Sequence, residues 1–227
     1  DMLHSMRQFD DLTYVHSVNV ALIASILGQW LKFSEKDIRI LTISGLLHDI
    51  GKIMIPNEIL TKPGKLTVAE YNIMKQHVNF GYEKVKNQNI DIRIKEACLL
   101  HHEKCDGTGY PFGLKSDHIP AVAKIIAIAD VYDAMTSARV YRGALCPFEV
   151  IDTMYKDAFT KFEPEYILPF LKNVASSYIN NDVRLSDGRI GKVVLINENA
   201  LSLPIVQCED EFIDLSKTRE LTVSAIL

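Results

Sequence analysis

The sequence predicts a mainly α-helical protein with a small β-rich appendage at its C-terminal end. Helical periodicity and helix-capping signals recur over the first 180 residues, and short apolar runs around an Asp-Gly turn follow them. We therefore divide the 227 residues into a helical domain, 1–180, and a small C-terminal β-rich extension, 181–227. Because so short a tail buries little core by itself, we expect it to dock on the helical body.

The helices are predicted from periodicity and from their first residues. Apolar side chains recur near the 3.6-residue period over residues 10–32, which predicts the first helix. Ser34 with Asp37 resembles a capping pair and opens a second helix to about Leu47. Because proline is tolerated in a first helical turn, proline also marks later helix starts. Further helices are predicted for residues 91–101, from Pro120 to about Ser137, and from Pro147 and Pro164.

Two segments between these helices have their own patterns. Thr67 and Glu70 form a capping box, which predicts a helix running through His77 to about Lys86. Residues 103–120 hold three glycines and two prolines and are predicted to form a long loop. Long ordered loops are often functional, so this loop is a candidate part of a binding site.

The C-terminal extension is predicted to form short β-strands. Residues 183–185 and 189–196 flank Asp187-Gly188, the pattern of a β-hairpin. Short strands are also expected at residues 205–206 and 211–215.

Composition and charge restrict the classes of function. The chain is 48% hydrophobic and 24% charged, which is typical of a folded protein and excludes a disordered one. A net charge of −4 disfavours broad DNA or RNA binding, because such binding needs a clustered basic face.

No apolar run in the sequence reaches the roughly 20 residues of a membrane span. Four cysteines without CxxC spacing predict neither a thiolate metal site nor disulfides, so we expect a cytoplasmic location. The chain begins at Asp1, and we expect an excised piece such as the C-terminal part of a larger sensor protein.

Histidine and aspartate side chains interrupt several apolar helical segments. His48-Asp49 and His101-His102 each end such a segment, and Asp130 follows the apolar run 125–129. Each alone has a simpler explanation, as a hydrogen-bonded histidine or a salt-bridged aspartate. Together they indicate a shared partner, and metal ions would satisfy several buried polar groups at once. The full set is His16, His48, Asp49, His77, His101, His102 and Asp130.

Longer strings carry a resemblance to a known family. The string His48-Asp49-Ile50-Gly51-Lys52, then His77, then HHEKCDGTGYP at residues 101–111, resembles the HD-GYP branch of the HD phosphohydrolase superfamily. Residues 130–142 resemble that family's next motif, and the resemblance covers about residues 10–175. It implies an HD-type helical bundle that holds metals and hydrolyses cyclic di-GMP to pGpG by attack of a metal-bridging hydroxide. A further step to GMP is left open.

The resemblance also implies the metal ligands. Its first metal would be held by His16, His48, Asp49 and Asp130, and its second by Asp49, His77, His101 and His102. Imidazole and carboxylate donors suit iron or manganese and tolerate zinc or nickel. Three-metal members carry a Glu four residues before the first ligand histidine, where this chain has Leu12. We therefore expect two divalent metal ions, unless Asp10 or Asp11 reaches in.

Substrate contacts are implied in the same way. Asp49 and Lys52 are the predicted catalytic residues, and Lys52 would bind the phosphate or protonate the leaving oxygen. Arg139 and Arg142 match the family's phosphate contacts, with a surface salt bridge as the simpler alternative. Tyr110 offers a flat face for a guanine.

Three functional hypotheses follow. The first is a cyclic di-GMP phosphodiesterase. The second is an HD-type phosphohydrolase acting on another cyclic dinucleotide or nucleotide, and the third is a weakly active cyclic di-GMP sensor or docking module. Ala138, where the family carries an acid, leaves room for the third. The resemblance further implies contacts of the GYP loop with diguanylate cyclases (GGDEF proteins), and a homodimer is left open.

Overall fold

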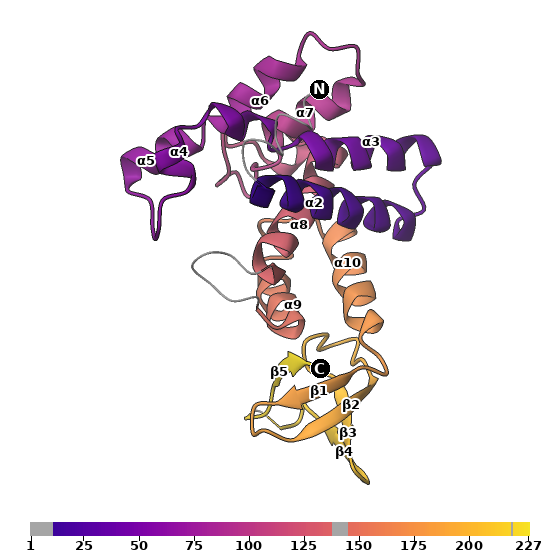
Figure 1. Cartoon of the computed structure of the whole chain (residues 1–227). Helices are drawn as coiled ribbons and strands as arrows, with labels where there is room; N and C mark the ends of the chain where they lie inside the picture. The colour runs from indigo at the N-terminus through magenta and orange to yellow at the C-terminus, as the bar shows by residue number, and fades with distance from the viewer. Residues whose placement is uncertain (1–10, 138–144, 219) are drawn as a thin grey trace.

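The computed structural model describes residues 11–137, 145–218 and 220–227, and it confirms a mainly helical chain with a small C-terminal sheet. Figure 1 shows the helices above and the sheet below, joined by α9 (Pro147–Lys156) and α10 (Pro164–Ser177). The elements in chain order are α2 (Asp11–Trp30), α3 (Glu35–Leu47), η1 (Ile50–Met54), α4 (Asn57–Leu60), α5 (Val68–Met74), α6 (His77–Val85), α7 (Ile92–Leu100), η2 (Ser116–His118), α8 (Ala121–Thr136), α9 (Pro147–Lys156), α10 (Pro164–Ser177), β1 (Asp182–Leu185), β2 (Ile190–Leu195), β3 (Ile205–Cys208), β4 (Glu211–Asp214) and β5 (Val223–Ile226).

Helices α2 and α3 form the first packed pair, and α2 also lies along α8. Val20, Ala24 and Leu27 of α2 are fully buried at this contact. By length and composition α2 is the one described helix that could cross a membrane, yet its buried face belongs to the core. The predicted cap of α3 is confirmed, because Ser34 Oγ accepts a hydrogen bond from the Asp37 amide at 3.2 Å.

The predicted helix from Thr67 to about Lys86 is wrong in its extent. Its capping box is present, but the helix ends at Met74 and a separate helix, α6, begins at His77. None of the residues of α5 is buried, so no core contact holds it in line with α6. The backbone of η1 packs against α6 instead: a Cβ on Gly51 would lie 1.9 Å from the His77 carbonyl oxygen. This close approach fixes His77 beside the end of α3.

The C-terminal sheet has five antiparallel strands in the order β4-β3-β2-β1-β5. The predicted hairpin is β1–β2, and Gly188 in its turn has a φ of +93°. The sequence prediction missed β5, which pairs with β1 at one edge of the sheet.

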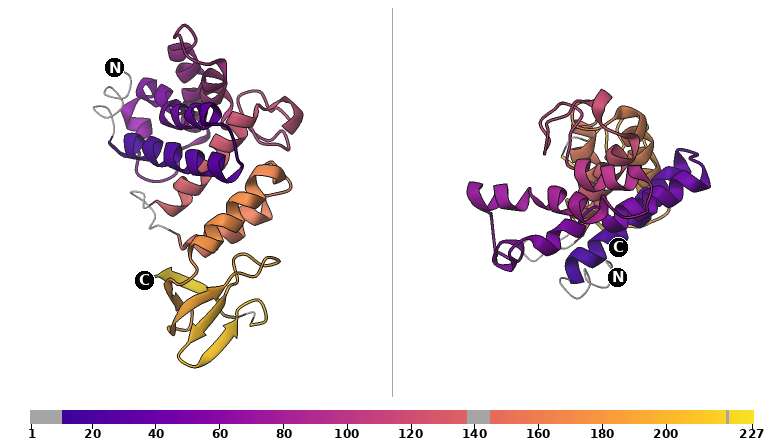
Figure 2. Two further views of the ribbon diagram at one scale, coloured as in Figure 1. Left: turned by 90° about the vertical axis from the view of Figure 1, so that its right-hand side faces the viewer. Right: turned by 90° about the horizontal axis from the view of Figure 1, so that it is seen from above.

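The sheet and the helices share one hydrophobic core. Leu185 of β1 and Val206 of β3 belong to the same buried cluster as Phe148 of α9 and Phe170 of α10. Figure 2 shows the sheet packed beneath these two helices. The expected docking of the C-terminal extension is therefore present, while the domain boundary at residue 180 remains a prediction.

Candidate metal centre

Two groups of potential metal ligands lie side by side in the helical body. Within each group, one nitrogen or oxygen per residue lies within 4.8 Å of the others. The residues come from α2, the end of α3, the start of α6, the end of α7, and α8. All seven ligand residues expected from the sequence are thus brought together. The first group is Asp49, His77, His101 and His102, and the second is His16, His48 and Asp130.

Asp49 stands between the two groups. Its Oδ1 lies 3.3 Å from His77 Nε2 and 3.9 Å from His101 Nε2. Its Oδ2 lies 3.2 Å from His48 Nε2 and 3.6 Å from His16 Nε2. Each carboxylate oxygen therefore faces a different group, which is the arrangement that a bridging ligand requires.

Local backbone geometry sets the orientation of the histidine rings. Three of them donate a hydrogen bond from Nδ1 to a backbone carbonyl oxygen three or four residues earlier in the chain. Since a carbonyl only accepts, Nδ1 carries the proton, and Nε2 of the neutral ring is left with a lone pair for a metal. The pairs are His48 with Gly45 at 2.7 Å, His77 with Met74 at 2.7 Å, and His101 with Ala97 at 2.9 Å.

The donor atoms fit a bound cation. His77 Nε2 and His101 Nε2 lie 3.4 Å apart, so two lone pairs converge in the interior. His48 Nε2 and Asp49 Oδ1 are buried, and neither has a hydrogen-bond partner among the described residues. Buried polar atoms without partners are costly, and one divalent cation in each group would satisfy these four atoms.

The electrostatics keep these groups in ligating form. Burial, reinforced by the neighbouring His102, holds the pKa of His101 well below its usual value, and burial lowers that of His102 to about 3. Burial would raise the pKa of Asp49, but the charge of Lys52 and contact with His48 hold it well below its usual range. Neutral imidazoles and an ionised carboxylate are the forms that bind metals.

His16 differs from the other histidines in its partners. Its Nδ1 donates to Asp133 Oδ2 at 2.6 Å, and its Nε2 lies 3.0 Å from Asp130 Oδ1. Burial lowers the pKa of His16, but contacts with Asp130 and Asp133 outweigh burial and raise it to about 9. A metal at Nε2 would take the place of a proton there.

Two of the predicted substrate residues border the centre. Lys52 Nζ lies 2.5 Å from Asp49 Oδ2. The Tyr110 ring stacks on His102, with centroids 4.7 Å apart and an interplanar angle of 27°. Arg139 and Arg142 fall outside the described residues. The catalytic and substrate roles of all four residues remain predictions.

The loop that carries Tyr110 is held by a carboxylate that the sequence analysis missed. Glu103 is buried and accepts backbone hydrogen bonds from Phe112 at 2.7 Å, Gly113 at 3.2 Å and Leu114 at 2.9 Å. Gly109 lets the loop fold back on itself, since a Cβ there would lie 2.5 Å from the Glu103 Cα.

Asp133 was also missed, although its sequence position carried a signal. It lies three residues after Asp130, so both side chains share one face of α8. Asn19 Nδ2 and Ser137 Oγ each donate to Asp133 Oδ1 at 2.9 Å, and these bonds fix the carboxylate that orients His16. The buried Glu103 directly after His101-His102 carried a comparable signal.

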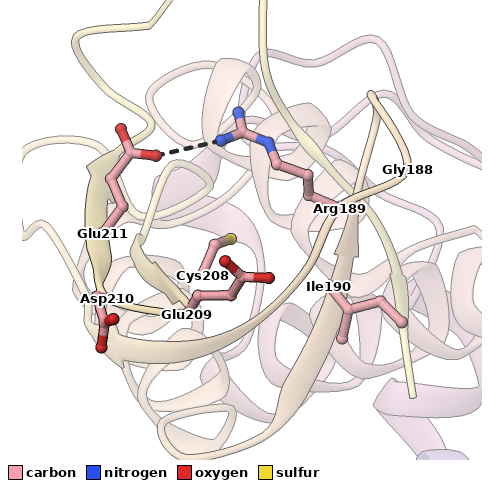
Figure 3. Close-up of a pocket in the computed structure, with 7 residues that line it drawn as sticks. All are labelled: Gly188, Arg189, Ile190, Cys208, Glu209, Asp210 and Glu211. Carbon is pink, nitrogen blue, oxygen red and sulfur yellow. Dashed lines mark hydrogen bonds and ion pairs between the residues drawn. The ribbon is translucent and has the colours of Figure 1, made fainter.

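A separate hollow of about 770 Å³ lies in the C-terminal sheet, away from the histidines (Figure 3). Arg189 and Glu211 approach across it at 3.5 Å. None of the predicted site residues lines it.

Comparison with known proteins places this centre in a family. The family model described as "HD domain" matches residues 6–166. A cyclic di-GMP phosphodiesterase of Pseudomonas aeruginosa is 36% identical over 203 residues, which are 89% of this chain and 49% of that protein. The cyclic di-GMP phosphodiesterase response regulator of Xanthomonas campestris is 41% identical over 155 residues, 67% of this chain and 41% of that protein. The chain thus spans about half the length of these curated relatives or less.

Solved structures agree on the fold. The HD domain of a Listeria monocytogenes phosphodiesterase, in complex with cyclic di-AMP, superposes with a TM-score of 0.59 at 18% identity, covering 78% of this chain and 94% of that one. An HDGYP protein from Bdellovibrio bacteriovorus gives a TM-score of 0.58 at 23% identity, covering 69% and 50%. The family model and the curated relatives confirm the resemblance drawn from the sequence motifs, and the chain belongs to the HD domain family.

Proposed function

We propose that this chain is a metal-dependent phosphodiesterase that hydrolyses cyclic di-GMP to pGpG. The observation that carries the proposal is the division of the Asp49 oxygens between two groups of histidine and carboxylate donors. Relatives named as cyclic di-GMP phosphodiesterases support the choice of substrate.

In this proposal His16, His48, Asp49 and Asp130 hold one metal ion, and Asp49, His77, His101 and His102 hold a second. Two divalent cations there would neutralise the phosphodiester charge and make a water-derived nucleophile available near neutral pH. The proposed ions are iron or manganese, because the donors are imidazole and carboxylate without thiolate.

The chain's own residues supply orientation and a proton. The Nδ1 hydrogen bonds of His48, His77 and His101 aim each Nε2 inward. Lys52 Nζ, beside Asp49, is placed to bind a phosphate oxygen or to protonate the departing ribose oxygen. Arg139 and Arg142 are proposed as further phosphate contacts.

The test is anaerobic purification, elemental analysis and assay of cyclic di-GMP turnover with iron or manganese. We expect two ions per chain and pGpG as product, and chromatography will show whether GMP follows.

His48→Ala and Asp49→Asn should lose both metal and turnover. Lys52→Met should keep the metals and lower kcat about a hundredfold. His118→Ala, an exposed histidine outside the centre, is the matched control. A chain loaded with two ions that leaves cyclic di-GMP intact would refute the proposal.

A second candidate substrate is 3'3'-cGAMP. A 3'3'-cGAMP-specific phosphodiesterase of Vibrio cholerae is 40% identical over 145 residues, 63% of this chain and 33% of that protein. A substrate panel of cyclic di-GMP, 3'3'-cGAMP and cyclic di-AMP separates the two candidates by kcat/KM.

Location and partners are also proposals. A cytoplasmic location fits the four free cysteines. Contacts of the GYP loop with diguanylate cyclases stay a prediction from the resemblance, and a homodimer stays open.

A further inference from the structure

A row of aromatic rings leads from the metal centre to the protein surface. Tyr110, stacked on His102, is followed by Tyr71, with ring centroids 6.5 Å apart at an interplanar angle of 81°. Tyr71 belongs to α5, and its side chain is 48% exposed. Figures 1 and 2 show α4 and α5 projecting from the helical body. The row therefore ends in solvent, on an element that adds nothing to the core.

Lys75 lies over both tyrosine rings. Its Nζ is 5.4 Å from the centroid of Tyr71 and 6.0 Å from that of Tyr110. Two other lysines of this region pair with carboxylates, Lys52 with Asp49 and Lys62 with Glu70. Within the part of the chain that the structure describes, Lys75 has no ion pair, so its N–H donors remain available to a ligand.

Local interactions, not burial, hold α5 in this arrangement. The capping box of Thr67 and Glu70 keeps α5 helical, and Lys62 ties Glu70 to the segment before it. On the other side, Glu103 fixes the loop that carries Tyr110. Two separately fixed segments thus meet through Tyr71, Tyr110 and Lys75 alongside the proposed phosphate site.

The chemistry of these three side chains matches a purine base. Two rings set nearly at right angles form a corner, in which a flat base can stack on one ring while the other meets its side. An ammonium that rests on ring faces can exchange those weak contacts for hydrogen bonds to the base edge. Guanine presents two acceptors, O6 and N7, on one edge, whereas adenine presents an amino donor in place of O6. The lysine ammonium can therefore donate to the O6 and N7 acceptors of guanine, whereas in adenine it meets an amino donor in place of O6.

We propose that Tyr71, Tyr110 and Lys75 form a base-binding subsite that selects guanine over adenine, next to the metal centre. The inference rests on the proposed function, because a cyclic dinucleotide whose phosphate lies at the metals must place a base nearby. Tyr71 and Tyr110 supply stacking that any purine would use, and Lys75 supplies the discrimination.

The test measures binding separately from hydrolysis. Hydrolysis-resistant phosphorothioate analogues of cyclic di-GMP and cyclic di-AMP are titrated by calorimetry into the full, metal-loaded chain. We expect the guanine analogue to bind about tenfold more tightly. Lys75→Met should weaken binding of the guanine analogue alone by about tenfold and abolish the preference. Tyr71→Ala should weaken binding of both analogues about tenfold, and Tyr71→Phe should restore it.

Matched controls separate recognition from a structural role. Lys65→Met removes an exposed lysine of the same region, and Ile73→Ala removes an exposed apolar side chain of the same helix. Both should bind the analogues as the parent chain does. Metal content and circular dichroism, unchanged in every variant, exclude loss of the centre or of the fold.

The outcomes distinguish this inference from the proposed function. Guanine selectivity that survives Lys75→Met, or binding unaffected by Tyr71→Ala, overturns the subsite even if cyclic di-GMP is hydrolysed. A guanine preference that is lost in Lys75→Met, together with weaker binding of both analogues in Tyr71→Ala, supports the subsite even if the chain does not hydrolyse cyclic di-GMP. A parent chain without selectivity, or one that binds neither analogue, overturns the subsite.

Discussion

At the scale of single residues, the centre depends on side chains that hold the proposed ligands in place. Asp133 accepts from His16 Nδ1 at 2.6 Å, and it is itself fixed by Asn19 and Ser137. This carboxylate–histidine pair leaves Nε2 as the atom of His16 that faces the proposed metal site. Such partners commonly change metal affinity 10–100-fold when removed.

We expect Asp133→Ala to weaken metal binding roughly 10–100-fold, because His16 loses its orienting acceptor. Asp133→Asn keeps a carbonyl oxygen, so its metal affinity should lie between that of Asp133→Ala and that of the parent chain. Competition with a chelator of known affinity measures the effect. Asp117→Ala, at an exposed carboxylate paired with His118, is the control. Unaltered affinity in Asp133→Ala would mean that backbone packing alone orients His16.

At the scale of elements, the helix that ends in His101 and His102 is anchored at its other end. Asp91 caps α7 by accepting from the Arg93 amide at 3.0 Å. Arg93 also donates to Asp91 and, at 2.7 Å, to Asp37 of α3. This network joins the starts of two helices whose other ends supply His48, His101 and His102. Helix α5, by contrast, is capped by Thr67 but buries none of its residues.

We expect Asp91→Ala to lower the free energy of unfolding by about 1 kcal/mol in urea denaturation. Thr67→Ala should change the free energy of unfolding less, because α5 can fray without exposing the core. The pKa of Asp91 is lowered to about 2 by its bonds to Arg93. The advantage of the parent chain is therefore full above the unfolded pKa of about 3.9 and fades as pH falls toward about 2. Equal losses in the two variants would show that α5 is as tightly coupled to the fold as α7.

At the scale of the whole molecule, one buried cluster includes the helical body and the sheet. Trp30, the chain's single tryptophan, packs against this cluster from α2 and reports on the helical body. Leu185 of β1 is 1% exposed and belongs to the same cluster. A shared core predicts that the two parts unfold together.

We expect Leu185→Ala to reduce the stability reported by Trp30 fluorescence by about 2–5 kcal/mol. Leu195→Ala, at a residue 54% exposed on β2, is the control and should have little effect. If Trp30 reports an unchanged transition in Leu185→Ala, the sheet unfolds as an independent domain.

Metal ions would also act on the whole fold, because their proposed ligands come from α2, α3, α6, α7 and α8. At a free metal concentration 100 times its dissociation constant, we expect about 2.7 kcal/mol of added stability. Thermal unfolding before and after chelation measures this difference. His48→Ala, which lacks a ligand, should show a much smaller shift; a shift as large as that of the parent chain would place the stabilising metal elsewhere.

The sequence by itself determined the helical class, the capped helix starts, the hairpin at Asp187-Gly188 and the set of residues that converge. These depend on periodicity and on interactions within a few residues, which a linear pattern records. The ligand set came from motif resemblance, and the structure brings all seven residues together.

Only the tertiary structure decided how those residues face one another. The division of the Asp49 oxygens, the 117-residue separation between His16 and Asp133, and the approach of Tyr71 to Tyr110 all join distant segments. The break between α5 and α6, and strand β5, likewise follow from packing against η1 and β1. Local propensity carries no information about such partners, because their energy arises only when the chain has folded.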